Sequence, residues 1–210
     1  MGLETKPLSS STNIQYNGFQ LDIGNAHTIR VPRSFFSTKV WGRTNCQERE
    51  GILECDTGDC GPNQKCSYYG RSPITVAQFN TNFLNGLPLQ YYQVSLINGF
   101  NLPISIVPEN DDCKSSSCEL EREQLKEVCS NQLQFFNTTG NINGCLSPCD
   151  KFKTRKTCCP TLSLNECDFD ISNNEYENIF EDYCPTANTF LKNSTDINSC
   201  HTNGYHVKFC

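Results

Sequence analysis

This sequence of 210 residues has no long hydrophobic run and no concentration of positive charge. No segment is long and apolar enough to span a membrane, and no apolar segment near the N-terminus resembles a signal peptide. The formal net charge is −6, and lysine and arginine form no basic patch of the kind that binds nucleic acid. The sequence therefore predicts neither a transmembrane protein nor a nucleic-acid-binding protein.

Histidine is also scarce, which bears on how the many cysteines are used. The only histidines are His27, His201 and His206, and none lies at a zinc-finger offset from a cysteine pair. The sequence contains 15 cysteines, a content that is usual in secreted proteins and high for cytosolic ones. Cys158 and Cys159 are adjacent, which places their Cα atoms about 3.8 Å apart, so they must bond to different partners. We therefore expect disulfides, no metal site and no cofactor.

The beginning of the chain is polar from its first residue, and the number of cysteines is odd. Either the chain is cytosolic, which its cysteines argue against, or its beginning has been lost. The second interpretation is favoured. We expect this sequence to be an N-terminally shortened fragment or an incomplete gene model, which a transcript extending upstream would establish.

Short stretches of alternating and β-branched residues predict a mainly β protein. The last of these stretches puts Tyr205, Val207 and Phe209 on one face. Strands from both ends of the chain must share a sheet, so the main body is predicted to be a sandwich. The predicted strands cover residues 27–31, 39–41, 74–79, 91–97, 104–107 and 205–209.

Two helices are predicted in the segment 113–200, which interrupts the strands. Ser116 and Glu119 can form a capping box for a helix that runs to about Leu133. Ser172 and Glu175 can cap a second helix. Its apolar residues recur at helical spacing, which is typical of core packing rather than of a cofactor site: Tyr176, Ile179, Phe180 and Tyr183.

The stretch 41–66 is rich in cysteines and turn formers but poor in apolar side chains, so disulfides must hold it together. It contains Gly51, Cys55, the run Thr57–Cys60, Gly61 and Cys66. This pattern resembles the signature of the thaumatin-like (osmotin-type, pathogenesis-related) proteins, from which Leu53 departs. The similarity runs from about Asn17 to Cys210. It includes Trp41–Thr44, Pro73–Phe79, Gly99–Pro103, Cys158–Cys159, Cys184–Pro185 and Phe209–Cys210.

The resemblance implies a thaumatin-like β-sandwich with two smaller parts. The sandwich core would comprise residues 1–45, 79–112 and 201–210, and its first strand would be missing from this sequence. Residues 46–78 would form a disulfide-held loop domain. Residues 113–200 would form a small, disulfide-rich helical domain.

The resemblance also implies which cysteines pair. Cys210 would be unpaired, because the family's last cysteine bonds to one in the first strand, which this sequence does not contain. The seven implied disulfides are Cys46–Cys55, Cys60–Cys66, Cys113–Cys200, Cys118–Cys184, Cys129–Cys145, Cys149–Cys158 and Cys159–Cys167.

Family members with antifungal or weak β-1,3-glucanase activity have an acidic cleft lined by one arginine and four carboxylates. The resemblance implies that the arginine is Arg43. The carboxylate positions fall on amides in this sequence, and one further nearby acid is replaced by Gln90. Amides can hold sugar hydroxyls but cannot donate a catalytic proton, so the cleft would bind without catalysis. The amides at the carboxylate positions are Gln78, Gln93, Asn98 and, beyond a loop one residue shorter, Asn193.

The function implied is that of an extracellular plant defence protein, located in the apoplast or vacuole, that acts as a monomer. It would bind fungal β-1,3-glucan or another fungal surface component, such as the membrane, without catalysis. A weak endo-β-1,3-glucanase and a diverged, inactive family member are the alternatives. Two sequons, at Asn137 and Asn193, are candidate N-glycosylation sites on a secreted chain.

Overall fold

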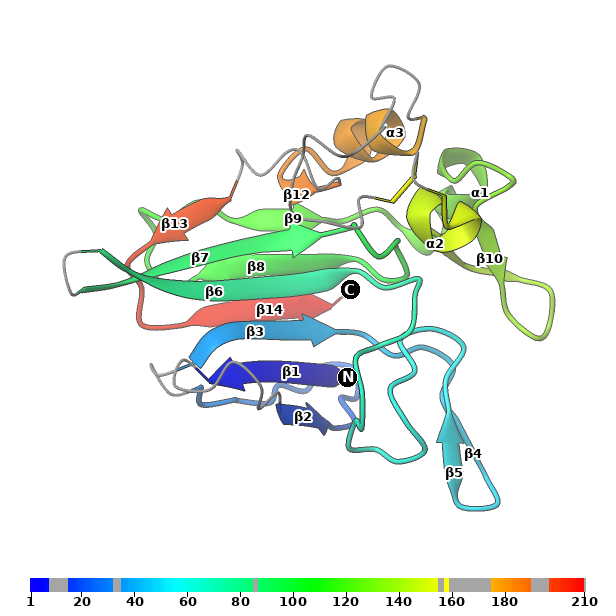
Figure 1. The fold of residues 1–210 in the computed structure, drawn as a ribbon, viewed down its shortest axis with the longest axis horizontal. Coiled ribbons are helices and arrows are strands. Elements are labelled where there is room, and N and C mark those ends of the chain that lie inside the picture. Colours follow the sequence, from blue (N-terminus) through cyan, green and yellow to red (C-terminus); the bar gives the residue numbers. More distant parts are fainter. Residues whose placement is uncertain are drawn as a thin grey trace.

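A computed structural model describes residues 1–7, 15–31, 35–84, 87–154, 157–158, 175–189 and 197–209. Strands dominate these residues, and their arrangement is that of a mainly β fold with several short helices (Figure 1). None of the helices in the described ranges has the length and apolar character needed to cross a bilayer.

The larger of the two main sheets has seven strands in the order β12-β7-β6-β3-β1-β2, with β13 also pairing with β7. All neighbours are antiparallel except β12 and β7. The strands are β1 (Gly2–Pro7), β2 (Gln15–Gly18), β3 (Phe35–Trp41), β6 (Val76–Leu84), β7 (Leu87–Ser95), β12 (Ala187–Asn188) and β13 (Asn198–Cys200).

A second, three-stranded sheet packs against it and completes the sandwich. Its order is β14-β8-β9, from β8 (Ile104–Pro108), β9 (Ser116–Cys118) and β14 (Tyr205–Phe209). The apolar residues of the two sheets form one core, in which Val94, Ile104 and Ile106 are fully buried. The C-terminal strand β14 pairs with β8 from the middle of the chain (Figure 1), whereas the first strands of the chain belong to the larger sheet. The expectation that the strands at the two ends of the chain share one sheet is therefore wrong for β1 and β14, because the two ends contribute to opposite layers of the sandwich.

Residues 46–75 form a loop region with one short hairpin, β4 (Gln47–Arg49) and β5 (Ile52–Glu54). The expected end of this region at residue 78 lies inside β6, because residues 76–78 pair with β3 in the larger sheet. Two disulfides hold this region, Cys46–Cys55 and Cys60–Cys66. The Trp41 side chain is fully buried beneath it and donates a hydrogen bond from Nε1 to the carbonyl oxygen of Gly58, 3.1 Å away. A tryptophan thus anchors a region that has little apolar content of its own.

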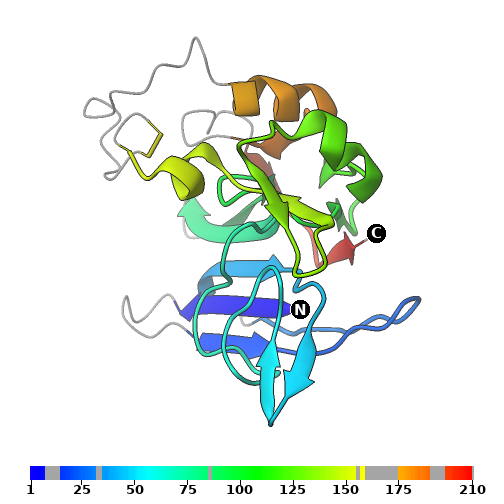
Figure 2. The same ribbon diagram turned by 90° about the vertical axis from the view of Figure 1, so that its right-hand side faces the viewer.

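The short helices lie together at the opposite end of the molecule from the β4–β5 hairpin (Figure 2). Tyr176 of the last helix donates to the carbonyl oxygen of Leu96 at 2.9 Å, and the Phe180 ring lies 5.9 Å from that of Phe100. The elements here are η1 (Arg122–Gln124), α1 (Leu125–Val128), the hairpin of β10 (Gln134–Phe136) and β11 (Ile142–Cys145), α2 (Pro148–Phe152) and α3 (Glu175–Tyr183).

Four further disulfides connect this end of the molecule. They are Cys113–Cys200, Cys118–Cys184, Cys129–Cys145 and Cys149–Cys158. Together with the two in the loop region, these are six of the seven pairs that the family resemblance implies. The seventh pair, Cys159–Cys167, and the expected unpaired Cys210 lie outside the described residues.

Three sequence-based expectations differ from the structure. Residues 27–31 form no strand and are exposed, because they do not lie within a sheet. Ser116 caps no helix: it lies in β9, where its hydroxyl accepts from Val94 N and donates to Thr186 O. The sheet does include a strand at the start of the chain, β1, between β2 and β3.

The helix expected to continue from Ser116 to Leu133 is also much shorter than predicted. Glu121 and Gln124 form a capping box, in place of the expected pair Ser116 and Glu119. Only the short helices η1 and α1 follow it. The helix predicted after residue 175 is present as α3, although Tyr183 is half-exposed rather than part of the core.

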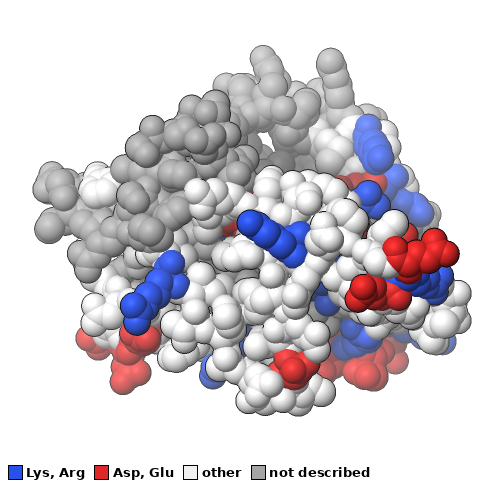
Figure 3. Space-filling view, turned by 90° about the horizontal axis from the view of Figure 1, so that it is seen from below, with Lys and Arg blue, Asp and Glu red and all other residues white. Residues whose placement is uncertain are grey.

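Charged side chains of both signs occur on one face of the molecule. On the face seen in Figure 3, acidic and basic side chains lie next to each other in small groups, separated by uncharged surface. The described part of this face therefore carries no broad field of one sign.

Candidate functional site

Four polar side chains form a row across the larger sheet. In the strand register Glu4 is opposite Lys39, Lys39 is opposite Gln78, and Gln78 is opposite Gln93. Side chains alternate along a strand, so these four lie on one face and their neighbours lie on the other. We call Glu4, Lys39, Gln78 and Gln93 the polar row. The neighbouring residues that face the sandwich core are Leu3, Val40, Ala77 and Val94.

One end of the polar row is an ion pair. The Lys39 Nζ lies 3.5 Å from Oε1 of Glu4, and these side chains are 29% and 11% exposed. Tyr16 is opposite Glu4 in β2, and its phenol is under the influence of the Glu4 carboxylate. Burial raises the pKa of Tyr16, and the charge of Glu4 raises it further. Glu4 is therefore held by partners on both of its neighbouring strands.

Tyr69 connects this ion pair to Asn98. The Lys39 Nζ lies 4.8 Å from the centroid of the Tyr69 ring, and that ring packs edge-on against Trp41 with centroids 5.1 Å apart. Its hydroxyl donates to Oδ1 of Asn98 at 3.4 Å. Asn98, one of the predicted site residues, thus joins the polar row through the Tyr69 side chain.

The surroundings of Tyr69 are also acidic. Its pKa is raised, mainly by burial and then by the negative charges of Glu4 and Asp150. Asp150 lies in α2, where its backbone N–H donates to the capping hydroxyl of Ser147. Two carboxylates from distant parts of the chain therefore act on the same phenol, and sequence reasoning identified neither of them.

The other end of the polar row is buried. Gln93 is only 7% exposed, and its Oε1 has no hydrogen-bond partner among the described residues. Gln78, its neighbour across the strand pair, is half-buried. A buried amide oxygen without a donor is costly, and a bound molecule that carries hydroxyl groups can supply that donor.

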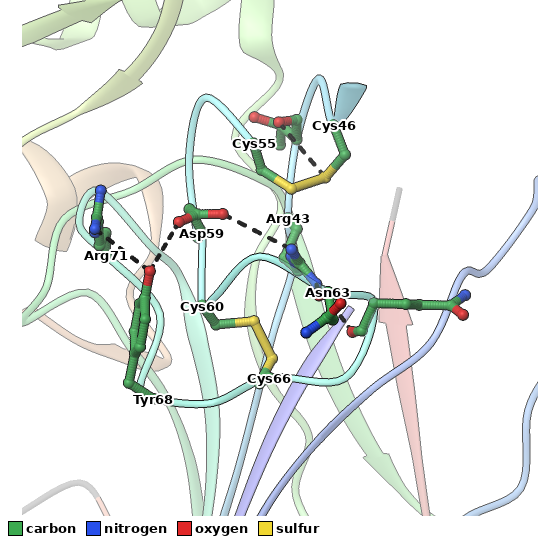
Figure 4. A network of polar contacts seen from close by, with 12 residues as sticks. Arg43, Cys46, Cys55, Asp59, Cys60, Asn63, Cys66, Tyr68 and Arg71 are labelled. Atoms are coloured by element: carbon green, nitrogen blue, oxygen red, sulfur yellow. Dashed lines mark hydrogen bonds and ion pairs between the residues drawn. A yellow bond between two sulfur atoms is a disulfide. The ribbon is translucent and has the colours of Figure 1, made fainter. Parts of the chain in front are cut away.

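Arg43 lies elsewhere, just before the loop region, and its side chain lies between the Cys46–Cys55 and Cys60–Cys66 disulfides (Figure 4). Its Nη1 donates to the carbonyl oxygens of Asn63 and Gln64, at 3.3 and 3.0 Å. Its Nη2 lies 3.7 Å from Oδ1 of Asp59, and this side chain is only 3% exposed. Burial lowers the pKa of Arg43, whereas the charge of Asp59 raises it. The cation in the polar row is therefore Lys39, and Arg43 supports the loop.

Each of these two cations has a carboxylate nearby, although the matched acidic positions of the sequence are amides. Asp59 lies beside Arg43, and Glu4 in β1 lies beside Lys39. Lys39 and Trp41 are two residues apart in one strand and so lie on the same face, which could have indicated from the sequence where Lys39 lies. The partners of Lys39 depend on the register between strands.

Gln90 lies on the other face of the sheet. It is three residues from Gln93 in the same strand, an odd spacing that puts the two side chains on opposite faces. A cavity of about 1870 Å³ on that side is lined by Gln90 and Arg43, together with Phe79 and Val207. Gln90 therefore does not belong to the polar row. Asn193 lies outside the described residues.

The described residues include no cluster of three or more histidine, cysteine, aspartate or glutamate side chains that could hold a metal ion. What the polar row offers is a set of hydrogen-bond donors and acceptors with one fixed ion pair. Such a set suits a neutral, hydroxyl-rich molecule.

Comparisons with known proteins all point to the same family. The family model described as Thaumatin family matches residues 2–210, and so includes β1. Pathogenesis-related 5 protein Jun a 3.0101 of Juniperus ashei is 32% identical over 195 residues, 92% of this chain and 79% of that protein. Pathogenesis-related thaumatin-like protein 3.8 of Cryptomeria japonica has the same identity and coverage.

A further relative covers a similar share of the chain. Thaumatin-like protein 1a of Malus domestica is 34% identical over 206 residues, 94% of this chain and 80% of the relative. The fold, the disulfides and these matches agree, and the chain belongs to the thaumatin family.

Proposed function

We propose that this protein is a secreted, pathogenesis-related defence protein that binds β-1,3-glucan of the fungal wall along the polar row and does not cleave it. The relatives are pathogenesis-related thaumatin-like proteins, which supports the general role. The observation that carries the finer proposal is the buried, unpartnered Oε1 of Gln93. A sugar hydroxyl would give this oxygen the donor that the described residues do not provide.

The two glutamines suit this ligand because they are uncharged. Each amide offers one acceptor and two donors, so adjacent amides can bind the hydroxyls of a neutral sugar. Gln78 is opposite Gln93, and Lys39, a third donor, is opposite Gln78. The row therefore presents donors and acceptors along a line, as an extended polysaccharide chain does.

Binding without hydrolysis follows from the same residues. Cleavage of a glycosidic bond needs an acid that protonates the leaving oxygen and a carboxylate that acts as base or nucleophile. Gln78 and Gln93 can do neither. Glu4 is engaged by Lys39 and Tyr16, so it is not free to act as a proton donor.

A weak endo-β-1,3-glucanase is the second candidate, favoured by the presence of Glu4 and Asp150 near Tyr69. The two functions differ in reducing-sugar release from β-1,3-glucan. We expect no release above that of a heat-inactivated sample. Release that is lost in Glu4→Gln would establish the second function and contradict the first.

Binding can be tested by co-sedimentation of the purified protein with insoluble β-1,3-glucan. Gln93→Leu and Gln78→Leu should each weaken retention about tenfold, the effect of one lost hydrogen bond to a buried group. Gln47→Leu is the matched control, because Gln47 is exposed in β4 and should leave retention unchanged. Equal retention of all three variants would refute a role for the polar row. Retention on lipid vesicles but not on glucan would assign the membrane as the target instead.

A further inference from the structure

The hairpin of β10 and β11 ends in a tight, exposed turn that contains the sequon Asn137-Thr138-Thr139. The backbone N–H of Asn137 donates to Asn141 O at 2.9 Å, and that of Gly140 donates to Asn137 O at 3.0 Å. Gly140 has φ of +80°, the left-handed conformation that closes such a turn. Threonines 138 and 139 and Gly140 are all exposed.

The turn uses one end of the Asn137 amide and leaves the other free. The Oδ1 atom accepts from Thr139 N at 3.1 Å, from Thr139 Oγ1 at 2.8 Å and from Asn141 N at 2.8 Å. No hydrogen bond within the described part of the chain uses its Nδ2. A substituent on Nδ2 therefore costs the fold no hydrogen bond, since the oxygen makes all of the turn's contacts.

An aromatic side chain lies next to this nitrogen in the sequence. Phe136, the last residue of β10, is 51% exposed. An exposed ring of this size leaves apolar surface in water, and the apolar face of a sugar on the adjacent residue can cover it.

We infer that Asn137 carries an N-linked glycan whose first sugar packs on Phe136. The donor is an oligosaccharide on a polyprenyl diphosphate, and the transfer is catalysed by the cell's own transferase. A bond forms between Nδ2 and C1 of the sugar, while the bond between C1 and the diphosphate oxygen breaks. The polyprenyl diphosphate leaves, and Nδ2 gives up one proton. The turn belongs to the β10–β11 sheet, whereas Gln93 belongs to the seven-stranded sheet.

This inference rests on the secretion assumed in the proposed function, so its test uses the 210-residue chain expressed behind a secretion leader in plant cells. Peptide mass mapping of the secreted protein, before and after enzymatic deglycosylation, reports the state of Asn137. In Asn193→Gln, which removes the other sequon, we expect most Asn137 to carry the glycan. Thr139→Ala should abolish the modification.

The packing on Phe136 has a separate readout. Deglycosylation should lower the melting temperature by about 2–4 °C, the shift expected for roughly 1 kcal/mol in a domain of this size. Phe136→Ala should remove that difference, whereas the control Phe152→Ala, which changes an exposed ring in α2, should keep it.

Two results would overturn the inference. One is secreted protein with its disulfides formed and Asn137 unmodified, which leaves the proposed secretion and glucan binding intact. The other is a glycan on Asn137 whose stabilising effect is the same in Phe136→Ala, which refutes the packing. Loss of glucan retention, in contrast, bears only on the polar row.

Discussion

The two faces of the seven-stranded sheet are built from the same strands but from different chemistry. One face, with Val40, Ala77 and Val94, packs into the sandwich core. The other carries the polar row, from the ion pair of Glu4 and Lys39 to the buried Gln93. Because successive side chains of a strand alternate between faces, one stretch of sequence serves both purposes.

The comparison teaches that burial has different consequences on the two faces. On the core face, burial removes apolar surface from water and stabilises the fold. On the polar face, burial of the Gln93 amide oxygen without a partner costs free energy. A residue that the fold tolerates at a cost is a reasonable place to look for binding.

The largest loss of stability should come from replacing a tyrosine that faces the core, and the adjacent tyrosine on the other face serves as the comparison. Tyr92 is 1% exposed in the core, whereas Tyr91 is half-buried on the face of the polar row. Tyr92→Ala should lower the free energy of unfolding by about 3–5 kcal/mol, since it leaves a large cavity. Tyr91→Ala should cost about 1 kcal/mol or less. Urea denaturation of the two variants measures both values, and equal losses would contradict the division between faces.

The ion pair should contribute much less than the core. Lys39 is partly exposed, and pairs of this kind couple by about 0.2–1 kcal/mol. A double-mutant cycle of Lys39→Met and Glu4→Gln, followed by thermal unfolding at low and high salt, measures the coupling. We expect it to shrink as salt increases. A coupling of several kcal/mol would show that the polar face stabilises the fold as the core does.

The smallest effect on stability is expected at Gln93. Gln93→Leu removes a buried amide oxygen that has no partner and places an apolar group there, so stability should stay the same or rise slightly. The same variant should lose glucan retention. A large loss of stability would show instead that the amide is part of the structural framework.

Much of the fold could be predicted from the sequence because its signals are local. The alternation in 104–107 and 205–209 marks β8 and β14, and the apolar spacing after residue 175 marks α3. The first helix could not be predicted in the same way. Ser116 and Glu119 have the spacing of a capping box, but the hydroxyl of Ser116 bonds to residues in other elements.

The candidate site was predictable only in part. Gln78 and Gln93 were recognised from the family pattern, and the strand register puts them opposite each other. Counting residues along β7 is enough to put Gln90 on the opposite face from Gln93. Glu4 could not have been found, because nothing local in the first residues of the chain indicates that they pair with β3.

By itself the sequence determined the class of fold, the family and the reliance on disulfides, because these follow from periodicity, motifs and the number of cysteines. Only the tertiary structure decided which cation joins the polar row, which carboxylate neutralises it and which amide lacks a partner. Those properties depend on strand register and on contacts between residues far apart in the chain, such as Glu4 and Lys39. Long-range pairing is set by the packing of the whole domain, and no local pattern encodes it.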